Sequence, residues 1–322
     1  VIRMRFVAGL VIASALTAAC AEEAPLPSSV EAPTPSTTPA ASPILSPTPN
    51  VLPSPSASPE PPEPKAYVPR PDAPIPRTSE RVASVLAKVT REVRKSVSNW
   101  VEEGDIFDRP PRRLVLQALY QQRIYRLMMR DEGLAERTLA RLSPRFRDGA
   151  RANVAAGARL LSLVTPITRP TRFKTGPTES AGTLLRWFRQ AERRFDVAWE
   201  VLAAVMYVES KFGKVKSTST AGAQGPMQFL PSTWGQYGMG GDIQNPRDAI
   251  LGAANYLRAS GAPADYRRAL FAYNRSQAYV DAVLLHANEI SKDRRNYFIY
   301  YNWQVFVVTT KGDVRLTGPG LD

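Results

Sequence analysis

The stretch from residue 79 to about residue 163 alternates apolar and polar positions with the period of an α-helix. Apolar residues recur at spacings of three and four in V-A-S-V-L-A-K-V-T-R-E-V (82–93), R-L-V-L-Q-A-L-Y-Q-Q-R-I-Y-R-L-M (113–128) and G-A-R-A-N-V-A-A-G-A-R-L-L-S-L-V (149–164). This spacing gathers the apolar side chains on one face of each helix, where they can pack together. We therefore predict that residues 79–170 form a small helical bundle of three to five helices.

A second helical region begins near residue 180, after a connector interrupted by prolines. Its segment V-A-W-E-V-L-A-A-V-M-Y-V-E-S (197–210) is apolar on most sides. Such a pattern is typical of a helix buried at the centre of a fold. The segment follows Asp196, whose side chain is of a type that often caps helix starts. We predict a central helix here, with Asp196 as its N-cap.

Further helix signals follow, and the chain then changes to a β pattern. Asn245 followed by Pro246 predicts a helix start, and two more helices are expected at 266–273 and 277–290. The run Y-F-I-Y-Y-N-W-Q-V-F-V-V-T-T-K-G-D-V-R-L-T (297–317) is rich in aromatic and β-branched residues, with K-G-D as a turn. The fold class expected is therefore mainly α, with a C-terminal β-hairpin.

The first 20 residues have the layout of an export signal. Arg3 and Arg5 precede an apolar run at 6–19, which is followed directly by Cys20. This run is shorter than the roughly 20 residues that span a bilayer. The ending L-T-A-A-C resembles a bacterial lipoprotein signal, although Thr17 stands where leucine is usual. We predict export, with lipidation of Cys20 as a membrane anchor; plain secretion and an uncleaved anchor are the alternatives.

Proline dominates the segment that follows. Of the 29 prolines in the chain, 18 lie between Ala21 and Glu80, mixed with Ser, Thr, Ala and Glu. So few apolar residues cannot offset the entropy lost on folding, so we predict that residues 21–78 are a disordered linker. Such a spacer would let an anchored protein reach into a polymer mesh.

The net charge and the scarcity of cysteine and histidine limit the kinds of partner and site that the chain can have. The net charge of +13 suits nucleic acid, anionic lipid or an acidic envelope polymer, and export removes nucleic acid as a partner. With Cys20 and His286 as the only cysteine and histidine, the chain has neither an intramolecular disulfide nor a Cys/His zinc ligand set. A Ser-His-Asp site would need His286, which the pattern A-V-L-L-H-A-N-E-I places on a helix surface. No metal site is predicted.

A carboxylate stands at the end of the predicted central helix. Glu209, in Y-V-E-S-K-F-G, would lie where burial and the negative end of the helix dipole both raise the pKa of a carboxyl group. A carboxylic acid kept neutral in this way can protonate a leaving oxygen, as glycosidic bond cleavage requires. Most glutamates at helix ends simply face solvent, so this position alone is a weak signal of catalysis.

Two downstream stretches strengthen the signal. The segment S-T-A-G-A-Q-G-P-M-Q-F-L-P-S-T-W (219–234) combines glycines, which let backbone approach a ligand, with Gln228, which offers both a donor and an acceptor. Its aromatic side chains suit either a sugar subsite or the core. The second stretch, A-L-F-A-Y-N, ends a predicted helix with Tyr273 and Asn274.

In this order the three stretches resemble the lytic transglycosylases that cut bacterial peptidoglycan. The matches are E-S-K-F to Glu-Ser-x-Phe, G-P-M-Q to Gly-Leu-Met-Gln and A-Y-N to Ala-Tyr-Asn-Ala-Gly. The surrounding sequence is most similar to the membrane-bound B-type branch and to its actinobacterial relatives. The departures are Pro226 in place of leucine, and R-S after Asn274. The resemblance implies a goose-type lysozyme-like α+β fold, with a catalytic domain at 180–295 and a β-hairpin extension at 296–322.

The resemblance also assigns roles. Glu209 would be the single catalytic acid/base, and no metal or organic cofactor would be needed. It would cleave the bond between N-acetylmuramic acid and N-acetylglucosamine and leave 1,6-anhydro ends. The substrate-binding residues would be Ser219, Gln228, Tyr273, Asn274 and Tyr279.

Two other functions stay open. One is a muramidase that hydrolyses the same bond with water, and the other is a non-enzymatic lipoprotein that binds peptidoglycan. The Arg-rich faces of residues 79–170 are either solvated or a surface for an envelope protein partner.

Overall fold

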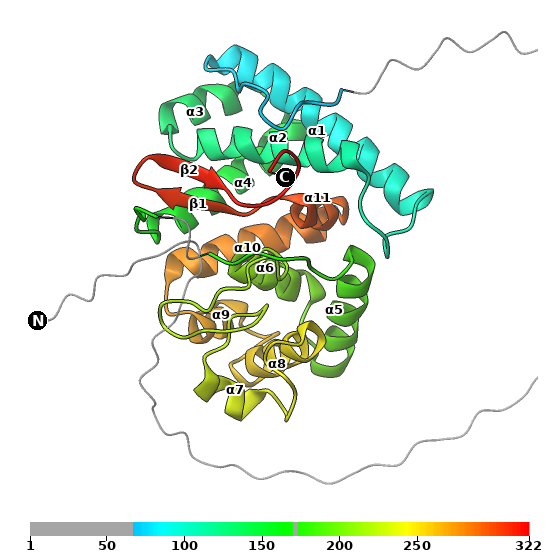
Figure 1. Ribbon diagram of the computed structural model, residues 1–322, viewed down its shortest axis with the longest axis vertical. Coiled ribbons are helices and arrows are strands. Elements are labelled where there is room, and N and C mark those ends of the chain that lie inside the picture. Colours follow the sequence, from blue (N-terminus) through cyan, green and yellow to red (C-terminus); the bar gives the residue numbers. More distant parts are fainter. Residues whose placement is uncertain (1–66, 170–172, 322) are drawn as a thin grey trace, which may run out of the picture. The chain divides into compact units, whose positions relative to one another are not determined.

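The computed structural model describes residues 67–169 and 173–321 (Figure 1). The predicted signal, the lipidation site Cys20 and most of the predicted linker therefore lie outside the described residues. Within the described ranges, no helix has the length and apolar character needed to cross a bilayer.

The first region contains four helices, which agrees with the prediction for this stretch. They are α1 (Ser79–Glu102), α2 (Arg112–Met128), α3 (Glu132–Arg141) and α4 (Pro144–Ser162). The apolar stripe of α1 is fully buried against its neighbours, because its valines and leucines recur at helical spacing. The start of α3 is capped by Asp131, whose side chain accepts a hydrogen bond from the backbone of Leu134.

The end of the predicted linker is ordered. Residues 67–78 lie against α2, although their proline content predicts disorder. Polar side chains of α2 hold this segment, since Gln117 donates to the carbonyl oxygen of Tyr67 at 2.8 Å and Tyr120 donates to that of Pro74 at 2.9 Å. An extended proline-rich chain leaves its carbonyl oxygens free for such contacts, so the neighbouring helix rather than composition decides the order here.

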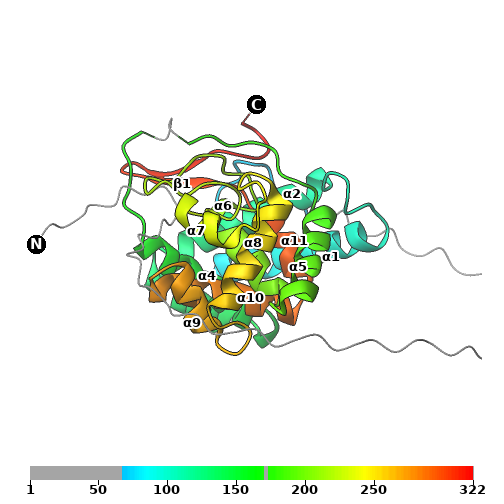
Figure 2. The same cartoon turned by 90° about the horizontal axis from the view of Figure 1, so that it is seen from below.

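The second region contains seven helices among the described residues. They are α5 (Ala181–Phe195), α6 (Trp199–Ser210), α7 (Pro231–Tyr237), α8 (Pro246–Ala259), α9 (Tyr266–Tyr273), α10 (Gln277–Lys292) and α11 (Arg295–Asn302). Helix α6 is buried on all sides, as its apolar sequence predicts. Viewed from below, α7, α8 and α9 come to the front, at the end of the fold away from α1 and α3 (Figure 2).

Of two helix N-caps predicted from the sequence, the structure confirms Asn245 and contradicts Asp196. Asn245 caps α8 as expected, by accepting hydrogen bonds from the backbone of Arg247 and Asp248. The prediction for Asp196 was wrong, because this residue ends α5 in the left-handed conformation, with φ of 56°. The start of α6 is held instead from the preceding helix, where Glu192 accepts a hydrogen bond from the backbone N–H of Trp199 at 3.1 Å. A cap supplied from another helix leaves no local sequence signal.

The C-terminal hairpin is confirmed, but it is shorter than the β-rich run. Strands β1 (Phe306–Thr309) and β2 (Gly312–Arg315) pair antiparallel. The preceding part of the run forms helix α11, in which most side chains are buried. Aromatic residues tolerate a helix when both of its sides are packed, so tertiary contacts override their β propensity here. The turn before α11 helps, since Asp293 accepts a hydrogen bond from the backbone of Arg295.

The apolar side chains of both regions form one continuous core. Helix α10 packs against both α4 and α6 (Figure 1). Aromatic rings join the regions elsewhere, with Trp100 edge-on to Phe298 at 5.6 Å and Tyr125 edge-on to Trp303 at 5.9 Å between ring centroids. The division of the chain into separate bundle and catalytic domains stays a prediction. Because the two regions share a core, it is tested by asking whether the second region folds without the first.

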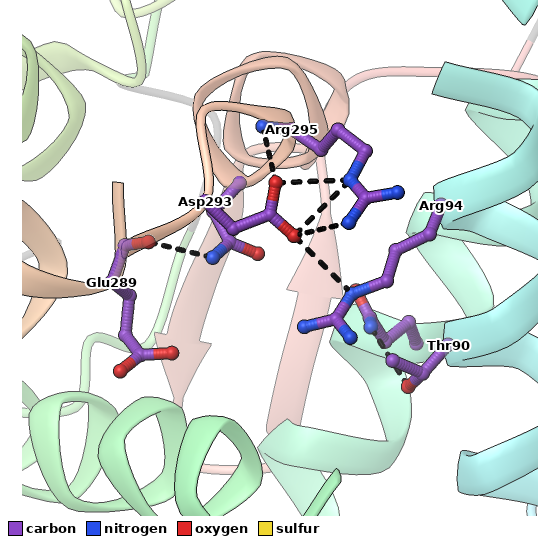
Figure 3. A network of polar contacts seen from close by, with 7 residues as sticks. Thr90, Arg94, Glu289, Asp293 and Arg295 are labelled. Carbon is purple, nitrogen blue, oxygen red and sulfur yellow. Dashed lines mark hydrogen bonds and ion pairs between the residues drawn. The ribbon is translucent and has the colours of Figure 1, made fainter. Parts of the chain in front are cut away.

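Polar contacts cross the same boundary. Gln122 of α2 donates to the carbonyl oxygen of Gln304 at 2.9 Å and accepts from its backbone N–H at 2.8 Å, with both side chains buried. On another side, Asp293 pairs with Arg295 at 2.9 Å and faces Arg94 of α1 at 3.8 Å (Figure 3). The Gln122–Gln304 pair fixes the register between the two regions, because breaking it would leave buried polar groups unsatisfied, whereas the partly exposed ion pairs contribute less.

Candidate active site

Glu209 lies in the last turn of α6 and is buried, with 2% of its surface exposed. The helix ends directly after it, because Lys211 and Phe212 both adopt left-handed conformations, with φ of 53° and 60°. Their backbone N–H groups close the helix by donating to the carbonyl oxygens of Tyr207 and Met206. The sequence prediction of a carboxylate at the end of a buried central helix is therefore confirmed.

One oxygen of this carboxyl group has a partner and the other does not. The hydroxyl of Tyr279 donates to Oε1 of Glu209 at 2.8 Å. Oε2 is buried and has no hydrogen-bond partner among the described residues. Tyr279 is itself fully buried in the first turn of α10, whose start is capped by Ser276. The tyrosine thus fixes one oxygen of Glu209 and leaves the other available.

The surroundings of Glu209 favour its neutral form. Burial raises the pKa of Glu209 to about 8, although the hydrogen bond from Tyr279 and the charge of Lys211 both act in the opposite direction. The group therefore carries its proton at neutral pH. A buried neutral carboxylic acid with one free oxygen can act as a general acid.

The glycine-rich segment passes beside Glu209. Ser210 donates to the carbonyl oxygen of Pro226, and Tyr273 donates to that of Met227 at 2.7 Å. Gly225 is required in this turn, because a Cβ there would lie 1.9 Å from the carbonyl oxygen of Ile243. The segment is thus held against the end of α6, and Ser210 supports it without the geometry of a nucleophile.

The structure places Tyr279 and Tyr273 beside Glu209, whereas the other predicted binding residues, all within the described part of the chain, form no hydrogen bond with it. Tyr273 is buried, and the charge of Glu209 adds to burial in raising its pKa, which indicates that the two groups are close. Gln228 and Asn274 are also buried, and Oε1 of the first and Nδ2 of the second have no partner among the described residues. Ser219 is half-buried in a separate turn, where its hydroxyl accepts from the backbone of Ala223 at 2.9 Å. Their roles in binding stay predictions.

Phe229 and Trp234 belong to an aromatic cluster beside this segment. Phe229 is buried, with ring centroids 5.2 Å from Trp234 and 5.6 Å from Tyr273. Trp234 is half-buried, and its indole N–H donates to the carbonyl oxygen of Gly241. Phe229 therefore packs in the core, and through Tyr273 the cluster supports the residues around Glu209.

The prediction for His286 was wrong. The imidazole is buried at 2% exposure, edge-on to the rings of Tyr207 at 4.8 Å and Tyr300 at 5.1 Å. Helix α10 packs against two other helices, so more of its circumference is covered than its sequence pattern indicates. Burial lowers the pKa of His286 to about 3, and the nearby charge of Lys211 adds to this effect. The imidazole is therefore neutral and forms no hydrogen bond to a serine or carboxylate of the described residues.

One buried lysine, Lys211, and one half-buried lysine, Lys214, were not predicted. Nζ of Lys211 donates to the carbonyl oxygen of Tyr207 at 3.0 Å and lies 4.0 Å from the centroid of its ring. Lys214 donates to the carbonyl oxygens of Tyr301 and Trp303. Burial lowers the pKa of each lysine to about 7. A lysine in a polar-looking loop normally faces solvent, so only the three-dimensional contacts reveal these two.

Comparison with known families identifies the region around Glu209. Residues 186–296 match the family model described as the transglycosylase SLT domain. These residues are similar to that domain, and we refer to the matched region as the SLT domain. The match contains Glu209 and all the predicted substrate-binding residues, and it confirms the resemblance to lytic transglycosylases drawn from three short motifs. The SLT domain also supports the lysozyme-like fold that was expected.

Similarity extends to a curated protein. The chain is 32% identical over 102 residues to the membrane-bound lytic murein transglycosylase F of Thiobacillus denitrificans. This match covers 29% of the present chain and 21% of the relative, so the chain spans about a fifth of the length of that protein. No solved structure matches the chain. No cluster of three or more potential metal ligands occurs within the residues that the structure describes.

The buried acid of the SLT domain should make stability depend on pH. The pKa of Glu209 is about 8 in the folded protein and close to 4.5 in an unfolded chain. Its neutral form therefore stabilises the fold fully below pH 4.5, and this contribution is lost as pH rises through 8. Glu209→Gln stays neutral at every pH, so we expect its free energy of unfolding to exceed that of the parent at pH 8.5 by on the order of a few kcal/mol.

Urea unfolding of both proteins at pH 4.5 and pH 8.5 would measure this effect. The advantage of the variant should be large at the higher pH and nearly absent at the lower one. An equal difference at both values would show that Glu209 ionises normally in the fold.

Proposed function

We propose that this protein is a peptidoglycan lytic transglycosylase that uses Glu209 as its only acid/base. It would cleave the β-1,4 bond between N-acetylmuramic acid and N-acetylglucosamine and form 1,6-anhydro ends. The observation that carries this proposal is the state of Glu209 inside an SLT domain. Its pKa of about 8 keeps it protonated, and its Oε2 has no partner among the described residues.

The contacts of Glu209 suit both halves of such a reaction. In the first half, the acid protonates the leaving glycosidic oxygen through Oε2, since Oε1 already accepts from Tyr279. The resulting carboxylate is stabilised by the same Tyr279 hydrogen bond and by the charge of Lys211. It then removes the proton from the muramyl 6-hydroxyl, which attacks the anomeric carbon with assistance from the N-acetyl group. Burial favours the acid before this step, and the two polar neighbours support the base after it.

The environment of Glu209 also supports a mechanism with one carboxylate. Inverting and retaining glycosidases place two carboxyl groups about 5–9.5 Å apart. Among the described residues, the groups that shift the pKa of Glu209 are Tyr279 and Lys211, and neither is a carboxylate. An intramolecular nucleophile needs no second carboxylate to activate water.

Unpaired polar atoms of two predicted binding residues are candidates for sugar recognition. Gln228 offers the acceptor Oε1 and Asn274 offers the donor Nδ2, both buried and without partners among the described residues. A buried amide group left unpaired costs about 1–3 kcal/mol, and an N-acetyl group or a sugar hydroxyl would recover this cost on binding. We assign Gln228 and Ser219 to the sugar and its N-acetyl group, and Asn274, Tyr273 and Tyr279 to the cleft wall.

The site of action would be the cell envelope. The relative from Thiobacillus denitrificans is named as a membrane-bound murein enzyme, and the signal-like segment with Cys20 would anchor the present protein. Residues 79–170 would then position the SLT domain or bind an envelope protein partner. Incorporation of labelled fatty acid tests the anchor, and incorporation that survives Cys20→Ala would reject lipidation at this residue.

The product ends test the proposed reaction. Purified peptidoglycan digested with residues 67–322 should yield muropeptides with 1,6-anhydro ends, about 20 Da lighter than the same fragments after reduction of ordinary hydrolysed ends. Mass spectrometry separates the two products directly. Reducing ends without anhydro ends would show that water is the acceptor and that the protein is a muramidase. An absence of any cleavage would favour a peptidoglycan-binding role.

A further inference from the structure

A small cavity lies behind the catalytic helix, between the two regions of the chain. Residues from α2, α4, α6, α10 and the hairpin line it, and its volume is about 40 Å³. This volume exceeds the roughly 10–15 Å³ that a single water molecule needs. Neither Glu209 nor Tyr279 lines the cavity, whereas Lys211, two residues after Glu209, does.

Several nitrogens in the cavity lining are buried without partners. Nη2 of Arg126, Nε1 of Trp303 and both ring nitrogens of His286 form no hydrogen bond with any described residue. The Arg126 and Trp303 groups are donors only, a neutral His286 adds one donor and one acceptor, and Oδ1 of Asn153, which also lines the cavity, is one more unpaired acceptor. Donors therefore outnumber acceptors around the cavity. Each unpaired donor destabilises the protein by about 1–3 kcal/mol unless a guest supplies an acceptor.

Positive charge also exceeds negative charge around the cavity. Arg126 pairs through Nε with Asp313 at 2.7 Å, and Asp313 is shared with Arg130. Lys211 forms no ion pair with a carboxylate among the described residues. The carboxyl group that acts on it electrostatically, Glu209, is neutral at neutral pH. A buried excess of positive charge favours an anion as the guest.

Most of the remaining wall is apolar, apart from the amides of Gln122 and Asn153. Leu160, Met129 and Phe306 line the cavity on the side of α4, α2 and the hairpin. A phosphate ion would lose hydration against such a wall without compensation, whereas a short alkyl group would gain from the contact. The lining thus offers hydrogen-bond donors for two oxygen atoms of a bound ligand and an apolar surface for one or two of its carbon atoms.

We propose that this cavity is a binding site for a small carboxylate with a short alkyl group. The carboxylate oxygens accept from Lys211, Arg126 and Trp303, and the alkyl group packs against Leu160 and Phe306. The guest touches α2 and α4 from the first region together with α6 and α10 from the SLT domain. It therefore stabilises the boundary between them. It also cancels the charge of Lys211 near Glu209, which raises the pKa of the acid further, so the site offers control over the protonation of Glu209.

The single histidine of the chain is a built-in reporter for this site. Protein labelled with ¹⁵N-histidine is titrated with acetate and propionate at pH 6.0, with sodium chloride holding the ionic strength constant. We expect saturable shifts of the His286 ring signals with dissociation constants of about 1–10 mM, since so few atoms make contact. Phosphate at the same ionic strength should produce no saturable shift.

Three variants separate specific binding from a general salt effect. Lys211→Met and Trp303→Phe each remove one donor and should weaken binding at least about 10-fold. Lys216→Met changes an exposed lysine in the same loop that does not line the cavity, and it should bind as the parent does. If Lys211→Met does not fold, Trp303→Phe alone decides. Equal affinity in Trp303→Phe and the parent would overturn the proposal.

The pH dependence provides a second readout. The groups that act on Lys211 are Arg126 from α2, Lys214 from its own loop, Glu209 from α6 and His286 from α10. Because Lys211 titrates near pH 7, affinity should fall between pH 6 and pH 8. Shifts that stay linear with concentration, or that chloride reproduces, would show that the cavity holds water only. Tighter binding of phosphate would refute the carboxylate assignment. None of these readouts requires the protein to cleave peptidoglycan.

Discussion

Replacing Glu209 with Gln is expected to lower the rate of peptidoglycan cleavage by about 1,000-fold, because general acid–base catalysis contributes about 10²–10⁴ to such reactions. Glutamine keeps the size of the side chain and can still accept from Tyr279 through its amide oxygen. It cannot donate a proton to the leaving oxygen or later accept one from the 6-hydroxyl. The release of soluble muropeptides from purified sacculi, followed by chromatography, measures the rate.

The same helix offers a matched control. Glu200 lies in the first turn of α6, is half-buried and also has a pKa raised by burial. It lies at the opposite end of the helix from Glu209, so Glu200→Gln should keep activity within about two-fold of the parent. Retention of more than a tenth of the parent rate in Glu209→Gln would contradict the assignment of the acid. The expected gain in stability at pH 8.5 shows that a loss of activity does not come from unfolding.

The second large effect concerns the boundary between the two regions. A fragment of residues 180–322 is expected to lose cooperative unfolding, although it contains the whole SLT match. This fragment lacks α1 to α4, so the face of α10 that packs on α4 would be exposed to solvent. Phe298 would lose its ring contact with Trp100, and Trp303 would lose its ring contact with Tyr125. Loss of one large aromatic partner costs about 3–5 kcal/mol, so two such losses equal much of the stability of a typical domain.

Circular dichroism during heating tests this expectation. The control fragment, residues 67–322, keeps the complete core and should unfold in one sharp transition. A broad transition and aggregation in the shorter fragment would show that the regions fold as one unit. A sharp transition of the shorter fragment would instead show that it is an independent domain, as its composition and motifs predict.

The sequence predicted the elements whose signals are local. Asn245 followed by Pro246 marked the start of α8, because the cap and the first helical residue act within one turn. The apolar run ending at Glu209 marked a central helix, since burial on every side leaves few polar residues. Three short motifs in a fixed order also indicated the region that the SLT family model matches.

The errors arose where distant segments decide the outcome. His286 is buried because α10 meets both α4 and α6, and the sequence of α10 alone does not reveal the second contact. The aromatic run of α11 is helical because it packs between other helices, against its own β propensity. The side chain of Lys211 is likewise buried because residues of α2 and of the C-terminal segment lie around it. Each of these features depends on residues more than 80 positions away.

The paired hydrogen bonds between Gln122 and Gln304 have a consequence for the order of events during synthesis. These residues are 182 positions apart, and both side chains are buried when the contact forms. A chain that is still growing has exposed Gln122 on α2 long before Gln304 exists. The early helices therefore stay incompletely packed until Gln304 and its neighbours have been synthesised. A nascent protein of this design should stay loosely folded until Gln304 and its neighbours are made, a state that would suit the export predicted from residues 1–20.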